Sequence, residues 1–213
     1  MLIIFSQMDI MKDKKTSKKI DISKDKMTTI KMAAMKGDWI KLSKFNTFVK
    51  DTSILPIKSP HNNNQIYSSS LFNYDTFYLQ ELVENLEKQN RPLKCILDLS
   101  EATHYTKKDI EALSGGVEYK KVKIKGKSIP NENDLKEILK IISKYDSNNE
   151  SICIHCKHGL NRTGYIIVSY LILIKGIENK LALQIFEEAR GLKIENKQYV
   201  NELLKLKKVE GKI

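Results

Sequence analysis

Residues 152–174, ICIHCKHGLNRTGYIIVSYLILI, place a polar segment with two glycines between two apolar segments. The first apolar segment is short, as in a buried strand, whereas the second is long enough for a buried helix. A strand that ends at His155 brings Cys156 to the carboxyl edge of a sheet, where α/β proteins bind their ligands. This stretch therefore predicts a functional loop between a central strand and a buried helix.

The composition limits the classes of protein that remain open. The chain has 213 residues, enough for one domain with a sizeable core, and a formal net charge of +11. Such a surplus attracts polyanions such as RNA, DNA or acidic lipid surfaces, although a solvated lysine-rich surface explains it equally well. Three cysteines are too few for a disulfide framework and indicate a reducing compartment.

Membrane insertion and secretion are not indicated by the sequence. The longest apolar run, residues 165–174, is about half the length of a membrane span. The opening MLIIF is too short for the apolar part of a signal peptide and has no basic residue before it. We expect a soluble intracellular protein without stable membrane association.

The chain divides into a tail and a domain. Residues 1–36 alternate lysine with polar residues and Met without a sustained hydrophobic period, which predicts a flexible basic N-terminal tail. Residues 37–213 are expected to form the folded domain. Strands and helices alternate there, so we predict an α/β fold with a mostly parallel central sheet flanked by helices. The expected strands are 94–99, 117–124 and 151–155, and the expected helices are 75–89, one that opens after Pro130, 162–175, 179–190 and about 196–207.

The segment HCKHGLNRTG, residues 155–164, has the features of a phosphate-binding loop. The five residues between Cys156 and Arg162 can curve so that their backbone N–H groups point inward, and the following helix adds its positive end. Gly159 permits a backbone angle closed to other residues, and Gly164 lets the helix approach the loop. Arg162 supplies a planar fork that matches two phosphate oxygens. The predicted phosphate-binding residues are Lys157, His158, Gly159, Leu160, Asn161 and Arg162.

The same positive surroundings predict a reactive Cys156. They favour the thiolate, and a thiolate beneath a bound phosphate is an in-line nucleophile. Cys156 would accept the phosphoryl group as a thiophosphate, which water then releases. Thr163 is placed to hydrogen-bond the sulfur and ease its departure in that second step. No metal or other cofactor is required, because the loop, the helix and Arg162 already neutralise the phosphate charge.

A second interpretation of the cysteines is metal or redox chemistry. Cys153 and Cys156 form a C-x-x-C pair close to two histidines, as in some zinc sites. However, the chain has no second cysteine pair, and strand alternation sends these two side chains to opposite faces. Cys95 and Cys153 are most simply buried strand residues, and a disulfide of either with an oxidised Cys156 is a further hypothesis.

The loop motif His-Cys-x-His-Gly-x-Asn-Arg-Thr-Gly resembles the cysteine-dependent phosphatases, and within them the RNA 5′-triphosphatase branch. That branch includes the triphosphatase half of metazoan capping enzymes, the stand-alone RNA/RNP-complex-interacting phosphatase and the baculovirus phosphatase. His158 and Asn161 are the branch-specific positions. The resemblance covers about residues 37–208, with further matches at Trp39, residues 97–100 and residues 186–199.

The resemblance implies a cysteine-phosphatase fold of the dual-specificity type and hydrolysis of the γ-phosphate of 5′-triphosphate RNA. Removal of the β-phosphate as well is left open. Cys156 is implied as the nucleophile and Arg162 as the phosphate clamp. Asp98 matches a family aspartate, either as a catalytic residue or as a structural one, and Asn196 matches a polar residue over the loop. A monomer in the nucleus, or in the infected-cell cytoplasm or nucleus if viral, is expected, with a separate protein as guanylyltransferase.

The usual general acid of this fold has no clear counterpart here. Residues 125–132 lack an obvious Asp, although Glu132 or Asp134 remain candidates. A departing diphosphate is weakly basic, so its protonation contributes little. The interpretation of the nearby cations is open between contacts with α- and β-phosphates or RNA and an ordinary solvated strand face. These cations are Lys123, Lys125 and Lys127.

Lys157 departs from the triphosphatase branch, which commonly has Thr after the nucleophile. Lys at this position is a feature of phosphoinositide phosphatases, although those enzymes typically carry a second Lys where this chain has Leu160. A phosphoinositide phosphatase and a protein tyrosine or dual-specificity phosphatase therefore remain alternatives. A non-catalytic RNA- or phosphate-binding module is a third class, which the intact Cys156, Arg162 and Thr163 disfavour.

Overall fold

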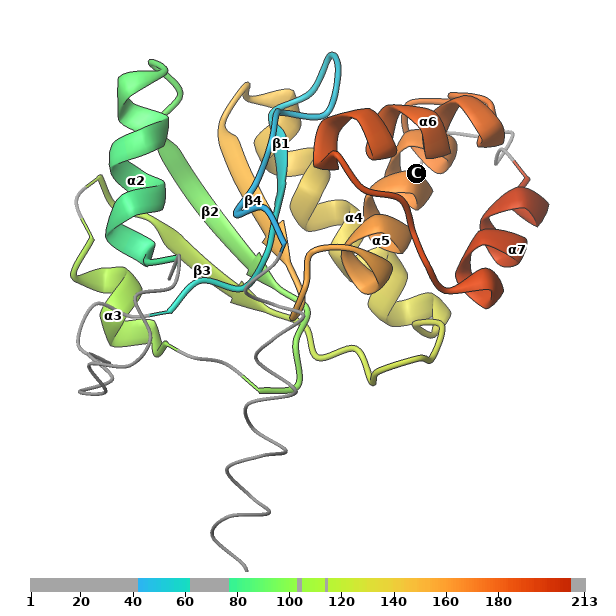
Figure 1. The fold of residues 1–213 in the computed structure, drawn as a ribbon, viewed down its shortest axis with the longest axis horizontal. Helices are drawn as coiled ribbons and strands as arrows, with labels where there is room; N and C mark the ends of the chain where they lie inside the picture. The colour runs from blue at the N-terminus through green and yellow to red at the C-terminus, as the bar shows by residue number, and fades with distance from the viewer. Residues whose placement is uncertain (1–41, 62–76, 103–104, 114, 208–213) are drawn as a thin grey trace, which may run out of the picture. The chain divides into compact units, whose positions relative to one another are not determined.

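A four-stranded sheet in the order β1-β4-β2-β3, with every neighbouring pair parallel, forms the centre of the computed structural model (Figure 1). The structure describes residues 42–61, 77–102, 105–113 and 115–207. The predicted α/β fold with a mostly parallel sheet is confirmed, whereas the predicted tail lies outside the described residues. The strands are β1 (Ile54–Ile57), β2 (Leu93–Asp98), β3 (Glu118–Lys121) and β4 (Ser151–His155).

Helices cover both faces of this sheet (Figure 1). Helices α4 to α7 contribute side chains to one hydrophobic cluster, and α2 and α3 contribute to a second cluster against the other face. The helices are α2 (Leu79–Lys88), α3 (Lys107–Glu111), α4 (Glu132–Ser147), α5 (Asn161–Leu173), α6 (Asn179–Arg190) and α7 (Lys197–Lys205).

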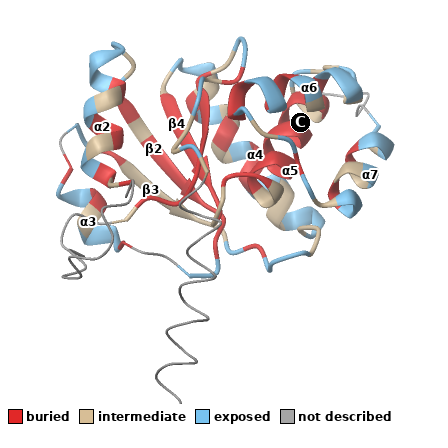
Figure 2. Cartoon of the chain, viewed as in Figure 1, coloured by how far each residue is buried: buried red, intermediate tan, exposed pale blue. Residues whose placement is uncertain are grey.

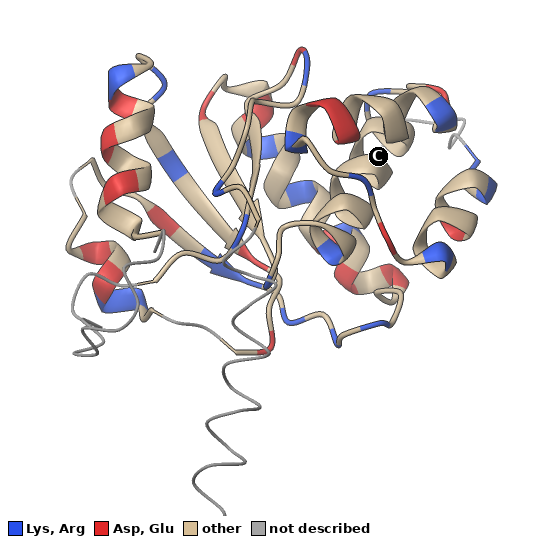
Figure 3. Cartoon of the chain, in the orientation of Figure 1, with Lys and Arg blue, Asp and Glu red and all other residues tan. Residues whose placement is uncertain are grey.

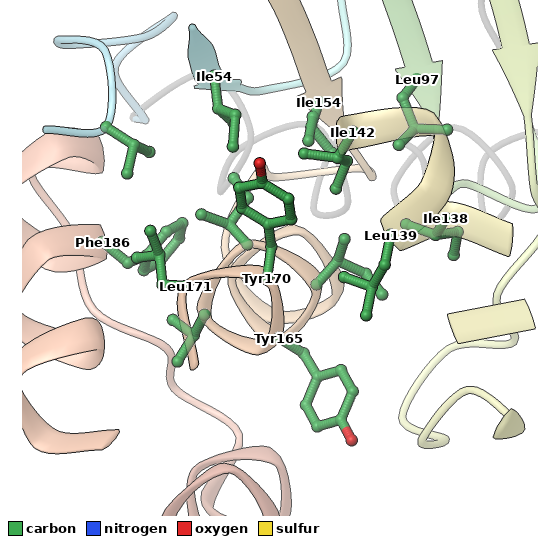
Figure 4. Close-up of a cluster of buried hydrophobic side chains, with 14 of the residues drawn as sticks. Ile54, Leu97, Ile138, Leu139, Ile142, Ile154, Tyr165, Tyr170, Leu171 and Phe186 are labelled. Carbon is green, nitrogen blue, oxygen red and sulfur yellow. The ribbon is translucent and has the colours of Figure 1, made fainter. Parts of the chain in front are cut away.

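Helix α5 lies at the centre of the larger cluster. Its residues from Thr163 to Ile172 are all buried (Figure 2). Tyr170 and Leu171 lie among Ile54 and Ile154 of the sheet and Phe186 of α6 (Figure 4). Each such apolar side chain contributes about 1.5–3 kcal/mol by leaving water. Burial on every side explains the long apolar run, and within the described residues no helix is long and apolar enough to cross a membrane.

Three elements differ from the sequence-based expectation. Strand β1 was not predicted because it has only four residues and contains Pro56. Proline is tolerated there since β1 lies at the edge of the four-stranded sheet, with β4 as its strand neighbour. Helix α3 was also not predicted, and it begins with a capping box of Thr106 and Asp109. Strand β3 ends at Lys121, before the expected end at residue 124, so the following lysines lie in a loop.

The strand register aligns four residues at the carboxyl edge of the sheet. Ile57 pairs with His155, His155 pairs with Asp98, and Asp98 pairs with Lys121. Cys156 is the first residue beyond this row. The predicted strand–loop–helix arrangement around Cys156 is therefore present, with β4 before the loop and α5 after it.

Candidate active site

A pocket of about 170 Å³ lies at the carboxyl edge of the sheet. Three separate segments meet around it: the turn after β3, the loop between β4 and α5, and the start of α7. Lys and Arg residues are frequent along the segment between β3 and α4 (Figure 3). The lining residues are Gly126, Lys127, Cys156, Lys157, His158, Asn161, Arg162, Asn196 and Tyr199.

The loop between β4 and α5 is held tightly against β1. Gly159 has φ +68°, and a Cβ atom there would lie 2.1 Å from the carbonyl oxygen of Ile57. Only glycine fits this position, because both the backbone angle and the space exclude a side chain. Helix α5 begins directly after Leu160, which makes no side-chain cap, so the first N–H groups of α5 remain available for an anion.

Gly164 has a different role in the first turn of α5. A Cβ atom there would lie 2.6 Å from a side-chain carbon of Ile194 and 2.8 Å from one of Phe186. The absent side chain lets α5 approach α6 and the segment before α7, whereas the sequence predicted a close approach to the phosphate-binding loop itself. The two glycines of the loop motif are thus required for different reasons.

Cys156 is only 3% exposed but lines the pocket. Burial by itself raises the pKa of a thiol, yet the pKa of Cys156 is lowered. The opposing causes are the charge of Arg162, a hydrogen bond from the Thr163 hydroxyl, and backbone N–H groups of Thr163 and His158. The Thr163 hydroxyl is buried without any other hydrogen-bond partner among the described residues. These contacts support the predicted thiolate.

Arg162 is oriented by carbonyl oxygens at the ends of the neighbouring strands. Its Nη1 donates to the carbonyl of Ile124 at 2.8 Å and lies 3.4 Å from that of Leu99. The carboxylate of Glu101 is 3.9 Å away and accepts a hydrogen bond from the Gly126 N–H. Glu101, whose role was not predicted, thus lies between the turn after β3 and the guanidinium of Arg162.

Asp98 lies in a buried polar network next to the site. Its carboxylate accepts hydrogen bonds from Lys121 Nζ at 2.7 Å, from Tyr119 Oη at 2.9 Å and from the Ser100 N–H at 2.8 Å. Burial raises its pKa, but His155, Lys121 and Ser100 outweigh this and lower it. The side chain is fully buried and does not line the pocket. This placement favours the structural role over the catalytic one.

His155 connects this network to the backbone of the nucleophile. Its Nδ1 lies 2.9 Å from the carbonyl oxygen of Cys156, which can only accept, so Nδ1 carries the proton of this hydrogen bond. Nε2 is bonded to the Tyr105 hydroxyl. The network therefore fixes the peptide that follows the strand, directly at the reactive sulfur.

Two of the site's rim residues are ordered by long-range contacts. The side-chain oxygen of Asn161 accepts from the N–H groups of Glu195 and Asn196, at 3.0 and 2.8 Å. Asn161 thus holds the segment before α7 through its side-chain oxygen, while its backbone N–H and its side-chain NH2 group are the donors that it can offer to a phosphate. Tyr199, not assigned a role from the sequence, donates its hydroxyl to the carbonyl of Ser128 at 2.9 Å. This contact closes the pocket on the side of the turn after β3.

The structure separates the lysines predicted to contact RNA. Lys127 lines the pocket with a left-handed backbone, φ +63°, a strained state typical of functional turns. Lys123 and Lys125 are exposed outside the lining, which favours the alternative of ordinary solvated residues, although they lie in a loop and not on a strand. Asn196, as predicted, lies at the pocket, and RNA binding by these residues stays a prediction. Gly159 and Leu160 are not among the lining residues, so their predicted contribution to phosphate binding is limited to their backbone N–H groups.

The metal and disulfide interpretations find no geometric support. Cys153 packs in the cluster under α2 and Cys156 in the cluster under α5, so they lie on opposite faces. No group of three or more His, Cys, Asp or Glu that could hold a metal occurs in the described part of the chain. Cys95 pairs with Ile152, four residues before Cys156, or about 13 Å along the strand direction. A disulfide requires Cα atoms within about 7 Å, so this pairing is excluded in this conformation.

Comparison with known proteins agrees with this geometry. Residues 77–209 match the family described as dual specificity phosphatase, catalytic domain. The chain is 29% identical over 168 residues to a tyrosine-protein phosphatase of Autographa californica nuclear polyhedrosis virus, covering 78% of this chain and 96% of that protein. It is 32% identical over 143 residues to the RNA/RNP complex-1-interacting phosphatase of Mus musculus, covering 65% of this chain but 44% of that protein.

Solved structures show the same fold. PTPMT1 has a TM-score of 0.56 and 16% identity, with 76% of this chain and 92% of that chain covered. Tk-PTP in its active form has a TM-score of 0.52 and 21% identity, with 73% and 95% covered. The chain belongs to the dual specificity phosphatase family, and it is a cysteine-type phosphatase with the fold of that class. Strand β1, which precedes the matched residues, forms part of the same sheet.

Proposed function

We propose that this phosphatase is an RNA 5′-triphosphatase that removes the γ-phosphate of 5′-triphosphate RNA without a metal ion. The observation that supports this substrate most is the charge of the pocket. Among the described residues that line it are three cations, Lys127, Lys157 and Arg162, and no carboxylate. A substrate with a chain of phosphates has charge for all three cations, whereas a single phosphate ester engages chiefly Arg162 and the loop.

The proposed reaction has two steps. The thiolate of Cys156 attacks the γ-phosphorus, a sulfur–phosphorus bond forms, and the bond to the β-phosphate oxygen breaks as the diphosphate RNA leaves. Water then attacks phosphorus, the sulfur–phosphorus bond breaks and inorganic phosphate is released. Arg162 and the loop N–H groups hold the phosphoryl oxygens through both steps. The Thr163 hydroxyl hydrogen-bonds the departing sulfur in the second step.

The candidates for a general acid are engaged elsewhere. Glu132 pairs with Lys136 at 2.6 Å, and Asp134 accepts from the Asn131 amide at 2.7 Å at the start of α4. Neither residue lines the pocket. Because a diphosphate leaves readily without a proton, this arrangement suits a triphosphate better than an alkyl or aryl phosphate ester. Removal of the β-phosphate by the same enzyme in a second reaction cycle is part of the proposal to be tested.

The relatives' names are consistent with more than one substrate. The RNA/RNP complex-1-interacting phosphatase is named for an RNA complex, while the viral relative is named a tyrosine-protein phosphatase. A protein tyrosine or dual-specificity phosphatase is therefore the second candidate. Lys157 at the pocket is the observation that favours a phosphoinositide. We further propose a separate guanylyltransferase as the next enzyme on the RNA, in the nucleus or in the compartment where a virus makes its transcripts.

The deciding experiment compares substrates in the presence of a metal chelator. Phosphate release is measured from γ- and β-labelled triphosphate RNA, a phosphotyrosine peptide and a phosphoinositide, with Cys156→Ser as the inactive control. We expect the highest kcat/KM on the γ-phosphate of RNA. A higher kcat/KM on the peptide or on the lipid would contradict the proposal and select that alternative.

A matched variant tests the role of the position after the nucleophile. Lys157→Thr installs the residue that is common in the triphosphatase branch. If RNA is the substrate, we expect kcat/KM on triphosphate RNA to fall by a few-fold, a larger loss than that on the phosphotyrosine peptide, because the phosphate chain loses one of its three cations while Lys127 and Arg162 remain. A selective loss of phosphoinositide turnover, with RNA and peptide turnover equally preserved, would argue against this assignment of the pocket.

A further inference from the structure

Arg190 is a fully buried arginine on the far side of the phosphate-binding loop. It is the last residue of α6 and does not line the pocket. Its guanidinium donates four hydrogen bonds within the fold. Nε donates to the carbonyl of Gly159 at 3.2 Å and Nη2 to that of His158 at 3.1 Å. Nη1 donates to the Ser43 hydroxyl at 2.8 Å and Nη2 to the Ser43 carbonyl at 2.9 Å.

No carboxylate in the described ranges forms an ion pair with Arg190, although it is as buried as any residue of the core. A buried cation without a counterion is costly, so such residues usually neutralise or find a charge. Burial lowers the pKa of Arg190 to about 10, while Cys156 opposes that change. The guanidinium therefore stays charged at neutral pH, and a thiolate at Cys156 favours that charge.

The two loop contacts also fix the direction of the loop amides. In a planar trans peptide, the C=O and the following N–H point to opposite sides. Because Arg190 holds the carbonyls of His158 and Gly159 on its own side, the N–H groups of Gly159 and Leu160 are turned away from it, toward the concave side of the loop. Those are two of the donors that a bound phosphate requires.

We propose that Arg190 is a positioning residue for the phosphatase reaction: a buried cation that orients the phosphate-loop amides from behind and balances the charge of Cys156. Arg162 touches the phosphate, whereas Arg190 acts through the peptides of His158 and Gly159. Ser43, which precedes β1, accepts hydrogen bonds from Nη1 and Nη2 and so fixes the position of the guanidinium relative to the loop. The proposal concerns the phosphatase site whichever substrate it accepts, so it does not depend on RNA.

The test separates the effect of the positive charge of Arg190 from the effect of its planar guanidinium, which donates to several acceptors at once. Arg190→Met removes both, and Arg190→Lys keeps the charge but cannot hold two loop carbonyls and Ser43 together. Arg91→Met is the matched control, because Arg91 stacks on Phe48 and donates to the Thr52 carbonyl at the opposite edge of the sheet. Circular dichroism and thermal unfolding establish that each variant is folded.

Two readouts report on the two parts of the proposal. The first is the pH profile of Cys156 alkylation by iodoacetamide, measured by mass spectrometry of the intact protein. The other titratable or charged groups around this sulfur are unchanged in every variant; they are Lys127, His155, Lys157, His158, Arg162 and Tyr199. The second readout is the affinity for orthophosphate, measured as competitive inhibition of p-nitrophenyl phosphate turnover.

For Arg190→Met we expect alkylation at pH 6 to slow by on the order of tenfold and orthophosphate to bind about tenfold more weakly. For Arg190→Lys we expect an alkylation profile close to wild type with weaker orthophosphate binding. Arg91→Met should change neither readout. A folded Arg190→Met protein with wild-type alkylation and phosphate affinity would overturn the proposal. If that variant does not fold, an Arg190→Lys protein with unchanged phosphate affinity overturns it instead.

Discussion

The sheet has one hollow at the amino ends of its strands and one at their carboxyl ends, which we call the amino edge and the carboxyl edge. The hollow at the amino edge is the larger of the two. That amino-edge hollow has a volume of about 410 Å³, against about 170 Å³ for the pocket at the carboxyl edge. Its lining residues are Phe48, Val49, Lys50, Asp51, Thr52, Ser53, Arg91, Asp146, Asn149 and Lys175.

The two hollows differ in how their charges are compensated. At the amino edge Lys175 Nζ lies 2.7 Å from the carboxylate of Asp146, and the Arg91 guanidinium stacks on Phe48. Asp146 also accepts from the Ser53 N–H and the Tyr170 hydroxyl, both at 2.7 Å. At the carboxyl edge the described lining has cations and loop amides without a carboxylate. A lining whose described residues hold cations and loop amides but no carboxylate, rather than a larger volume, therefore marks the site of chemistry.

The strongest test of this comparison exchanges cysteines. Cys156→Ser should reduce phosphate release by about 10⁴-fold or more, because the nucleophile is removed while the pocket remains. Cys153→Ala, three residues earlier within β4 and also buried, should keep turnover within a few-fold of wild type. Phosphate release from a common substrate measures both. Comparable losses in the two variants would show that the carboxyl-edge thiol has no special role.

A second test exchanges arginines between the two edges. Arg162→Lys should lower kcat/KM by about 10²- to 10³-fold, because an ammonium cannot bind two phosphate oxygens in the plane of a fork. Arg91→Lys at the amino edge should leave kcat/KM unchanged. Steady-state kinetics of both variants on one substrate give the answer. Equal effects would mean that the two hollows contribute alike.

A third test compares two glycines with nearly the same backbone angle. Gly159 has φ +68° and Gly116 has φ +65°, but a Cβ at Gly116 would meet nothing within 4 Å. Gly116→Ala should cost about 1–2 kcal/mol of unfolding free energy from the backbone angle alone. Gly159→Ala should cost about 3 kcal/mol or more, because its Cβ also meets Ile57. Urea unfolding measures both, and equal losses would contradict the close contact between the loop and β1.

The smallest expected effect is a pH dependence of stability with opposite signs for two thiols. The pKa of Cys156 is lower in the folded protein, so its contribution is complete above the unfolded value of about 8.5 and is lost as the pH falls through the folded pKa. Burial raises the pKa of Cys153, so its contribution is complete below about 8.5 and is lost as the pH rises.

Differences in unfolding free energy across pH measure this contrast. Relative to Cys156→Ser, wild type should gain stability as the pH rises toward about 8.5. Relative to Cys153→Ala, wild type should lose stability above that pH. Two slopes of the same sign would show that the surroundings of Cys156 do not favour its thiolate.

The sequence predicted the parts of this molecule that depend on near neighbours. Cys156 and Arg162 are separated by one loop, and the full motif His-Cys-x2-Gly-x2-Arg-Thr-Gly between an apolar strand and an apolar helix indicates a phosphate cradle. The buried helix α5 and the strand β4 follow from their apolar runs. The mostly parallel sheet follows from the alternation of strands and helices, because parallel strands require crossover connections.

The parts that escaped prediction depend on contacts between distant residues. Arg190 reaches Ser43 across 147 positions of the chain, and Tyr199 reaches Ser128 across 71. Neither residue stands out locally, because an arginine at a helix end and a tyrosine on a helix face are ordinary. Strand β1 was also missed for lack of information about distant residues. Its Pro56 argues against a strand unless that strand is known to lie at the edge of a sheet.

The contact between Tyr199 and Ser128 affects when the pocket of this enzyme is completed during synthesis of the chain. Helix α7 supplies Tyr199, and the segment before it supplies Asn196, so the rim of the pocket is incomplete until synthesis has passed residue 199. A nascent chain that already has the sheet and α5 would hold its reactive sulfur in an unfinished cleft. Catalytic competence is thus acquired only after α7 has been synthesised and has docked on the rest of the domain.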